Sequence, residues 1–303
     1  MKNSLLIASH EIRSQIREKT FLLLLAVFVG MTLASTFIGW SSQDTISRVY
    51  SVVAQEKRQS GQSVPPSPFE NLPPLSLAKN MIIYVVLIGG LLAIDVGYST
   101  GMRERKAGAG KLLFSRPITR ADFLIGKLLG VSFILAAVLS IAAVISMVSS
   151  AVLVRLEPQD ILRLSGFYGF SFVYMLGFAF LGFGFAMAWE DEVMALLSPL
   201  IVWVVITFML PELSSALYPT GSLNPTLPQT DILQSPALQA IHDIVYPFSI
   251  SEHYKGCAAA ILGIDAGTDA TIRCYGGATI FAWLLFGILA GAYAMSGFDA
   301  SRW

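Results

Sequence analysis

Six long apolar stretches constrain the fold of this chain more than any other feature of its sequence. A membrane-spanning helix needs about 20 mostly apolar residues to cross a hydrocarbon core of about 30 Å. Six windows meet that requirement, and they lie at residues 20–40, 78–100, 123–154, 166–189, 193–211 and 276–297. Charged residues make up only 13% of the chain, whereas soluble domains carry about 25%. The sequence therefore predicts an all-α integral membrane protein with six transmembrane helices.

The distribution of Lys and Arg among the loops predicts the orientation of these helices. Basic residues gather before the first span and in segment 101–122, whereas segment 212–275 carries only Lys255 and Arg273. Because basic loops stay on the cytoplasmic side, we expect both termini and segment 101–122 in the cytoplasm. Segments 41–77, 155–165 and 212–275 are then expected to face outward. The net charge of zero excludes a global basic field that would attract nucleic acid.

Residues 1–19 are predicted to form an amphipathic helix before the first span. Leu5, Ile12 and Ile16 fall near one helical face. The polar residues on the other face are His10, Glu11, Arg13, Arg17 and Glu18. Such a helix can lie in the interface beneath the cytoplasmic leaflet. The alternative is a solvated basic leader that only sets the topology.

Segment 101–122, GMRERKAGAGKLLFSRPITRAD, concentrates charge in a chain that has little of it. Its Gly110-Lys111 pair looks like part of a phosphate-binding loop, but Leu112 stands where that motif requires Ser or Thr, and position 105 is not Gly. ATP hydrolysis by that motif is therefore excluded. A short helix over 111–114 would expose apolar side chains that need a cover, supplied by lipid headgroups, the protein's own helices or a partner protein. Thr119 and Asp122 have the spacing of a capping box that opens the third span.

The same segment resembles the loop after the second span in ABC-2 type ABC transporter permeases. The residues that carry the resemblance are Arg103-Glu104-Arg105, Leu112-Leu113, Ser115-Arg116-Pro117, Arg120, Phe123 and Gly126-Lys127. Within that family the segment is most similar to the NosY-like branch, which contains the permease of the nitrous oxide reductase maturation system. The resemblance implies an ABC-2, type V exporter-like permease fold, with residues 1–303 forming a single transmembrane domain.

The resemblance also implies how such a chain works. In these permeases the loop docks into a groove on a separate ATPase subunit, and two permeases pair with two ATPases in the cytoplasmic (inner) membrane. ATP and Mg²⁺ would be bound by the ATPase, so we expect no cofactor, metal or catalytic residue in this chain. The expected coupling residues are Arg103, Glu104, Arg105, Leu112, Leu113, Phe114, Arg116, Pro117 and Arg120, with Leu112, Leu113 and Phe114 as the apolar anchor. The alternative is a basic loop that serves only topology.

Three further polar features fall near the cytoplasmic side of the predicted spans. The acidic turn Glu190, Asp191 and Glu192 between spans four and five is either a second contact to the ATPase or to the basic loop, or a solvated turn. Asp95 lies within span two, where carboxylates are costly and by default indicate function. An ion pair of Asp95 with Arg103 or Lys127 is favoured over a proton relay. The Lys127 side chain can itself reach the headgroups.

Small residues predict close packing between the spans. Three pairs have the G-x-x-x-G spacing: Gly97 and Gly101, Gly126 and Gly130, and Gly287 and Gly291. Span four mixes glycines with the phenylalanines Phe172, Phe178, Phe180, Phe183 and Phe185. Apolar cores and apolar pathways share a composition, so these rings do not by themselves indicate a cargo pathway. Core packing is therefore favoured over the lining of such a pathway.

The outward segments contain features of their own. Residues 61–74, GQSVPPSPFENLPP, are predicted to form an irregular Pro-rich linker. Segment 212–275 is expected to form a small external cap, and a partner on the outer side is possible. Cys257 and Cys274 both lie in that segment and predict a disulfide in an oxidising compartment. The competing interpretation is a copper or zinc site with His253 and His242.

Membrane enzymes are the rival class of function. The H-E-x-x-H motif of zinc proteases is absent from the sequence. The G-x-S-x-G spacing occurs at residues 97–101, but there it lies at the end of a predicted spanning helix and not at the strand-to-helix turn that a nucleophile elbow requires. The sequence therefore favours a homodimeric, non-catalytic permease that exports cargo with a separately encoded ATPase. An ATP-independent membrane scaffold or anchor for an extracytoplasmic assembly is the alternative. Lipid, peptide, a small sulfur or metal species, and mechanical work on an external partner are all compatible with the sequence.

Overall fold

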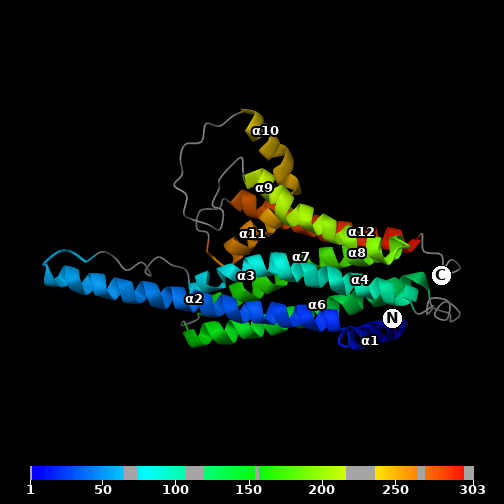
Figure 1. Cartoon of the computed structure of the whole chain (residues 1–303), viewed down its shortest axis with the longest axis horizontal. Coiled ribbons are helices and arrows are strands. Elements are labelled where there is room, and N and C mark those ends of the chain that lie inside the picture. Colours follow the sequence, from blue (N-terminus) through cyan, green and yellow to red (C-terminus); the bar gives the residue numbers. More distant parts are fainter. Residues whose placement is uncertain are drawn as a thin grey trace.

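The computed structural model describes residues 2–64, 74–106, 119–153, 157–215, 236–264 and 270–296. Within these ranges the chain is helical, and six helices are long and apolar enough to cross a membrane (Figure 1). They cover Lys19–Gln59, Lys79–Arg103, Ala121–Val152, Pro158–Ala188, Glu192–Leu213 and Tyr275–Ser296. The predicted all-α architecture with six spans is therefore confirmed.

The helices that form the six spans differ in their regularity. Spans one, three, four and six lie within the single helices α2 (Lys19–Gln59), α6 (Arg120–Leu153), α7 (Pro158–Ala188) and α12 (Ala270–Ser296). Span two consists of α3 (Lys79–Tyr84), the π-helical turn η2 (Val85–Gly89) and α4 (Gly90–Lys106), and follows the 3-10 turn η1 (Pro74–Ala78). Span five consists of α8 (Glu192–Val204), the π-helical turn η3 (Val205–Met209) and α9 (Leu210–Ser215). Only spans two and five are therefore interrupted by π-helical turns within the described part of the chain.

The first span is much longer than its apolar stretch. The first span was predicted to end at residue 40, but its helix α2 continues to Gln59, so residues 41–59 of the predicted outward segment are helical. This extension adds about 28 Å at roughly 1.5 Å per residue. The helix continues because its next Gly is Gly61, which has a φ of 69°. There the N–H of Gly61 donates to Arg58 and the N–H of Gln62 donates to Lys57, which is a Schellman end. Residues 65–73 of the predicted Pro-rich linker lie outside the described residues.

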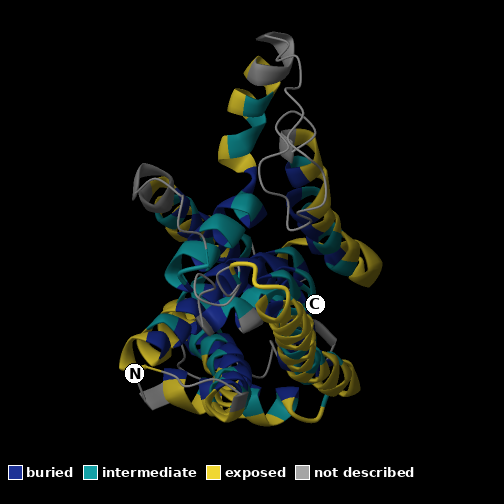
Figure 2. Ribbon diagram, turned by 90° about the vertical axis from the view of Figure 1, so that its left-hand side faces the viewer, coloured by how far each residue is buried: buried dark blue, intermediate teal, exposed yellow. Residues whose placement is uncertain are grey.

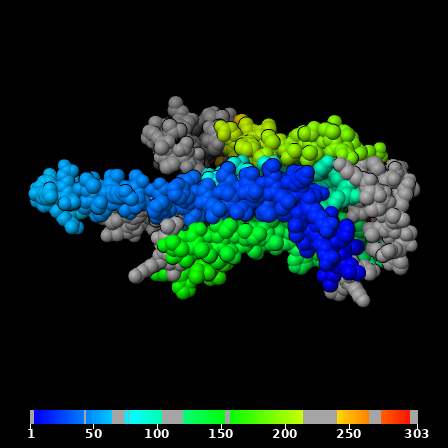
Figure 3. All heavy atoms as spheres, turned by 60° about the horizontal axis from the view of Figure 1, so that its bottom comes forward, coloured from blue at the N-terminus to red at the C-terminus, as the bar shows by residue number. Residues whose placement is uncertain are grey.

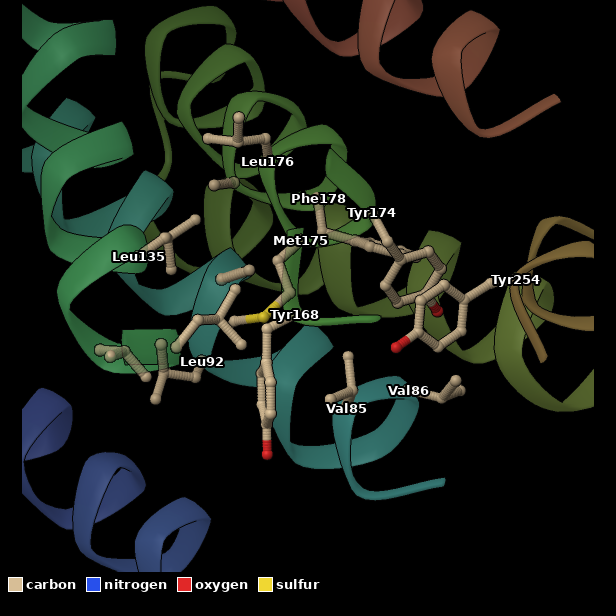
Figure 4. Packing of buried hydrophobic residues seen from close by; sticks show 14 of the residues in the cluster. Val85, Val86, Leu92, Leu135, Tyr168, Tyr174, Met175, Leu176, Phe178 and Tyr254 are labelled. Carbon is tan, nitrogen blue, oxygen red and sulfur yellow. The ribbon is translucent and has the colours of Figure 1, made fainter. Parts of the chain in front are cut away.

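Helix α7 occupies the centre of the bundle, between α4 and α12. Glycines allow the three backbones to approach: a Cβ on Gly97 would lie 1.8 Å from the carbonyl oxygen of Ala179, and one on Gly287 would lie 2.7 Å from that of Gly177. The prediction that the glycine pairs pack closely is confirmed for these contacts. Phe178, Phe180 and Phe183 are buried, and Phe172 and Phe185 are partly buried against the core, as expected for packing. Figure 4 shows Phe178 among the packed side chains.

In each of the two π-helical turns, a side chain from another element donates a hydrogen bond to a backbone carbonyl. In η3 the N–H of Leu210 donates to Val205, and Pro211 has no N–H to offer Ile206. The hydroxyl of Ser251 instead donates to the Ile206 carbonyl at 2.7 Å. In η2 the Val86 carbonyl accepts a hydrogen bond from Trp203 Nε1 of span five at 3.3 Å. These two bonds connect span five to span two and to the outer segment.

The outer segment between spans five and six contributes three described elements. They are α10 (Pro236–Val245), the 3-10 turn η4 (Tyr246–Phe248) and α11 (Ile250–Ile261). Instead of lying only above the membrane, α11 packs into the bundle, where Tyr254 stacks on Tyr174 at 4.3 Å and its hydroxyl lies 2.6 Å from Ser171 Oγ (Figure 4). Helix α10 instead projects away from the bundle (Figures 1 and 2).

The outer surface of the spans is rich in exposed apolar side chains. Phe37 of α2, Phe133 of α6 and Ile201 of α8 are examples. Figure 3 shows α2 and α6 side by side along one face, with α1 (Lys2–Gln15) across one end. In a membrane protein such a surface contacts lipid, because the hydrocarbon solvates apolar side chains.

A candidate coupling site at one end of the bundle

Helix α1 is attached to α6 through one of the predicted glycine pairs. A Cβ on Gly126 would lie 2.8 Å from the Cβ of Ile7, and a Cβ on Gly130 would lie 2.8 Å from the Cβ of Glu11. Larger residues would therefore push α1 away from span three. The face of α1 that makes this contact contains Ser4, Ala8, Glu11 and Gln15, all of which are buried.

The position of Glu11 corrects the predicted amphipathic pattern of the first helix. Glu11 was expected on the solvated face, but it is only 1% exposed. Its carboxylate accepts hydrogen bonds from Thr100 Oγ1 at 2.9 Å, from Lys127 Nζ at 2.5 Å and from Arg103 Nη2. A buried carboxylate is tolerated only when it is paired and hydrogen-bonded, and helices α4 and α6 supply those partners. The exposed positions of α1 include the apolar Leu5 and Leu6, and Ile16 directly after the helix is exposed as well.

Gln15 and Glu18 extend this polar contact along α4. Gln15 is fully buried, and its Oε1 accepts hydrogen bonds from Ser99 Oγ at 2.9 Å and from Arg103 Nη2. Glu18 Oε1 lies 3.6 Å from Arg103 Nη1. We call Glu11, Gln15, Glu18, Ser99, Thr100, Arg103 and Lys127 the polar cluster. It joins α1, span two and span three at one end of the bundle.

The predicted partner of Lys127 is also corrected. Lys127 neither pairs with Asp95 nor reaches the surface: it is 1% exposed and bound to Glu11. Asp95 has a buried Oδ2 without a hydrogen-bond partner, and within the described ranges it forms no ion pair. Glu11 reaches both Arg103 and Lys127 because α1 packs against α4 and α6.

The predicted capping box at the start of span three is confirmed in its main features. Helix α6 begins at Arg120, and Thr119 Oγ1 accepts the N–H of Asp122 at 3.1 Å. The Thr119 hydroxyl donates to Asp122 Oδ2 at 2.9 Å, and Ser4 Oγ donates to Asp122 Oδ1 at 3.3 Å. Helix α1 thus contacts span three immediately after segment 107–118.

Most of the predicted coupling residues lie outside the described part of the chain. Leu112, Leu113, Phe114, Arg116 and Pro117 belong to segment 107–118, and the side chains of Glu104, Arg105 and Arg120 are also not described. Their roles stay predictions. Of the predicted coupling residues in segment 101–122, the side chain of Arg103 is described, and it lies in the polar cluster.

The acidic turn after span four is exposed at its three acidic positions. Asp191 Oδ1 accepts the N–H of Val193 at 3.2 Å and so caps α8. The Tyr98 hydroxyl donates to the Glu192 carbonyl at 3.3 Å, which connects the turn to span two. Glu190 and Glu192 therefore lie on a surface turn next to α4, and both sequence interpretations of this turn stay open.

The cysteine and histidine residues of the outer segment occupy α10, α11 and the start of α12. Cys257 is buried, and the side chain of Cys274 is outside the described residues, so the disulfide stays a prediction. His253 is buried against Tyr246 at a ring distance of 4.5 Å. Burial lowers the pKa of His253, and the Tyr246 backbone and Glu252 oppose this shift. Among the described side chains, no group of three or more His, Cys, Asp or Glu is arranged to hold a metal ion.

Five members of the polar cluster were missed by the sequence reasoning: Glu11, Gln15, Glu18, Ser99 and Thr100. A signal was present in α1, because Ser4, Ala8, Glu11 and Gln15 recur at helical spacing and are small or polar. Such a face matches the glycines and the buried Lys127 of span three. The prediction instead assigned the membrane-facing side of this helix from its apolar residues, which lie on a different face.

Comparison with known protein families agrees with this architecture. Residues 5–298 match the family described as ABC-2 family transporter protein, which covers nearly the whole chain. A comparison with curated proteins gave no match. Members of this family are typically non-catalytic membrane subunits of transporters. With six spanning helices and a family match from end to end, this chain belongs to the ABC-2 transporter family.

Proposed function

We propose that this chain is the permease subunit of an ABC transporter, coupling ATP hydrolysis by a separate ATPase to export across the cytoplasmic membrane. Two copies would pair with two ATPase subunits, both termini would be cytoplasmic, and ATP and Mg²⁺ would be bound by the ATPase. Family membership supports the transporter assignment. The resemblance of segment 101–122 supports the finer assignment to the NosY-like branch.

The polar cluster is the observation that carries the coupling mechanism. It surrounds the ends of the two helices that lead into and out of segment 107–118, namely α4 and α6. Glu11 binds a cation from each of these helices. Breaking a buried ion pair by removing one partner typically costs about 3–5 kcal/mol. Displacement of the segment by an ATPase would therefore move α1, α4 and α6 as one unit.

The docking surface in this proposal combines a charged rim with an apolar anchor. Leu112, Leu113 and Phe114 would fill a groove on the ATPase, with the neighbouring cations and Glu104 at the rim. The exposed acidic turn at Glu190, Asp191 and Glu192 would provide a smaller second contact. The Tyr98 bond to this turn would connect that contact to span two.

An extracytoplasmic accessory partner is a further part of the proposal. The extension of α2 beyond the apolar stretch supports it, because residues such as Val49 and Val52 are exposed on a helix that projects past the bundle (Figure 1). A helix of this length gives a partner on the outer side a surface well separated from the bilayer.

Purification of the tagged protein in mild detergent tests the proposed ATPase partner. Wild type would be compared with Leu113→Asp and Glu104→Lys in the loop, and with Val49→Asp as a control that places the same charge on the outer extension. The proposal expects a P-loop ATPase to co-purify with wild type and with the control but not with the loop variants. If no nucleotide-binding protein accompanies an intact dimer, the chain is an ATP-independent scaffold instead.

A further inference from the structure

Helix α10 and the turn after it carry an exposed apolar stripe that lies outside the six spans. Ile241 is 44% exposed, and Ile244 and Phe248 are each 67% exposed. Residues three or four apart on a helix lie on the same side, so Ile241 and Ile244 share a face, and Phe248 follows four residues later in η4. Two large apolar side chains therefore share one exposed face of α10, and a third is exposed in the turn directly after it.

The other side of α10 is polar and faces the bundle at one edge. His242 stacks on Tyr246 with ring centroids 5.1 Å apart, and Tyr246 contacts His253 of α11. Asp243 is exposed, and its place on the helical wheel is opposite the apolar stripe. The helix is thus amphipathic, with an apolar stripe, a polar exposed side and an edge held by aromatic contacts.

The position of α10 limits which molecules can contact its apolar stripe. Two views at right angles show that α10 projects sideways from the bundle, across the direction of the spans (Figures 1 and 2). It contacts α9, the last turn of span five. At that end of span five, Phe208, Met209 and Leu213 are exposed apolar side chains. The stripe and these exposed apolar side chains therefore lie at the same end of span five.

We propose that α10 is an interfacial helix whose stripe inserts among the acyl chains of the adjoining leaflet. Amphipathic helices of this kind lie in the membrane plane with their apolar face at the boundary between headgroups and acyl chains. In the orientation proposed above, this is the outer leaflet. Asp243 then faces the headgroups and water. The turn η4 joins α10 to α11, and Ser251 bonds α11 to span five. An α10 anchored in the leaflet therefore holds the outer segment at a fixed depth relative to the membrane.

Spin labelling of the full-length protein in phosphatidylcholine–phosphatidylglycerol nanodiscs tests this proposal. Asp243→Cys, Ile244→Cys and Phe248→Cys would each carry a nitroxide, and unsubstituted protein treated in the same way would measure background from the native cysteines. Phe133→Cys on span three provides a lipid-exposed reference. Power saturation would compare collisions with oxygen, which concentrates in lipid, and with a water-soluble nickel chelate.

The proposal expects oxygen to nickel accessibility ratios at 244 and 248 close to that at 133, and a lower ratio at 243. Equal, nickel-accessible signals at 243, 244 and 248 would place the stripe in water and overturn it. Labels at 244 and 248 shielded from both reagents would show a protein cover, such as a second copy, and would overturn it as well. The measurement needs no ATPase, so it is independent of the proposed coupling function.

Discussion

Neutralising Glu11 is the sharpest test of the polar cluster. Glu11→Gln keeps the size of the side chain but removes the charge that binds Lys127 and Arg103. Lys127 is almost completely buried, so the substitution leaves a cation in the core without its carboxylate. Removing one partner of a buried pair costs about 3–5 kcal/mol. The hydrogen bond from Thr100 can be kept by the amide oxygen, so the loss comes mainly from charge.

The double variant Glu11→Gln with Lys127→Met separates the ion pair from general packing. It removes both charges of the closest pair, and replacing a buried pair by apolar residues is often neutral. We therefore expect the double variant to recover much of the stability that Glu11→Gln loses. The comparison forms a double-mutant cycle in which residues in contact show coupling of about 0.5–3 kcal/mol.

Thermal unfolding of the purified protein in detergent is the assay. Each kcal/mol of lost unfolding free energy lowers the midpoint temperature by about 2–4 °C in domains of roughly 150–250 residues. Glu11→Gln should therefore unfold at a temperature well below that of wild type. Glu56→Gln, an exposed acid on the α2 extension, is the matched control and should change stability by about 0.5 kcal/mol or less. A Glu11→Gln variant with the wild-type melting midpoint would refute the role of this ion pair, as would a double variant destabilised by the sum of its two single changes.

Three further outcomes follow from individual contacts. Gly130→Leu should separate α1 from span three and lower the melting midpoint, because a Cβ at position 130 would collide with Glu11 of α1. Gly30→Leu is the control and should leave the midpoint unchanged, because a Cβ at position 30 has no neighbour within 4 Å. Ser251→Ala leaves a span-five carbonyl unpaired and should cost about 1–3 kcal/mol in the same melt, with Ser165→Ala as an exposed control; equal losses would refute this. Burial lowers the pKa of His253, so the unfolded chain takes up a proton first, and stability should be full above a pH of about 6.5 and decline as pH falls through the folded-state pKa. His253→Phe should flatten that decline in melts recorded at several pH values, and an unchanged pH profile would exclude His253 as its source.

Much of the membrane architecture could be predicted because its signals are local. Apolar runs long enough to span a bilayer leave few alternatives to helices, and all six predicted spans are present. The capping box at Thr119 and the close contacts at Gly97 and Gly287 were also predictable, because each depends on a short spacing. The length of α2 was missed because the prediction followed hydropathy, while the helix is ended only by Gly61.

The candidate site was only partly predictable because it depends on residues distant in the sequence. Lys127 and Arg103 were recognised, but their partner was assigned to Asp95. A charged residue on a surface helix is expected to face water, since burying a lone charge is costly. Glu11 contradicts that rule only because two cations from other helices reach it.

The sequence by itself determined that this chain is a six-span helical membrane protein, since the energetic cost of unpaired backbone in lipid allows little else. It also determined where the helices begin at their caps and where small residues permit contact. The tertiary structure decided which side of α1 is buried, which carboxylate neutralises Lys127 and which hydroxyl satisfies Ile206 in span five. These choices depend on which segments far apart in the chain meet in space, because a hydrogen bond needs donor and acceptor about 3 Å apart and the energy of a charge pair weakens as its separation grows.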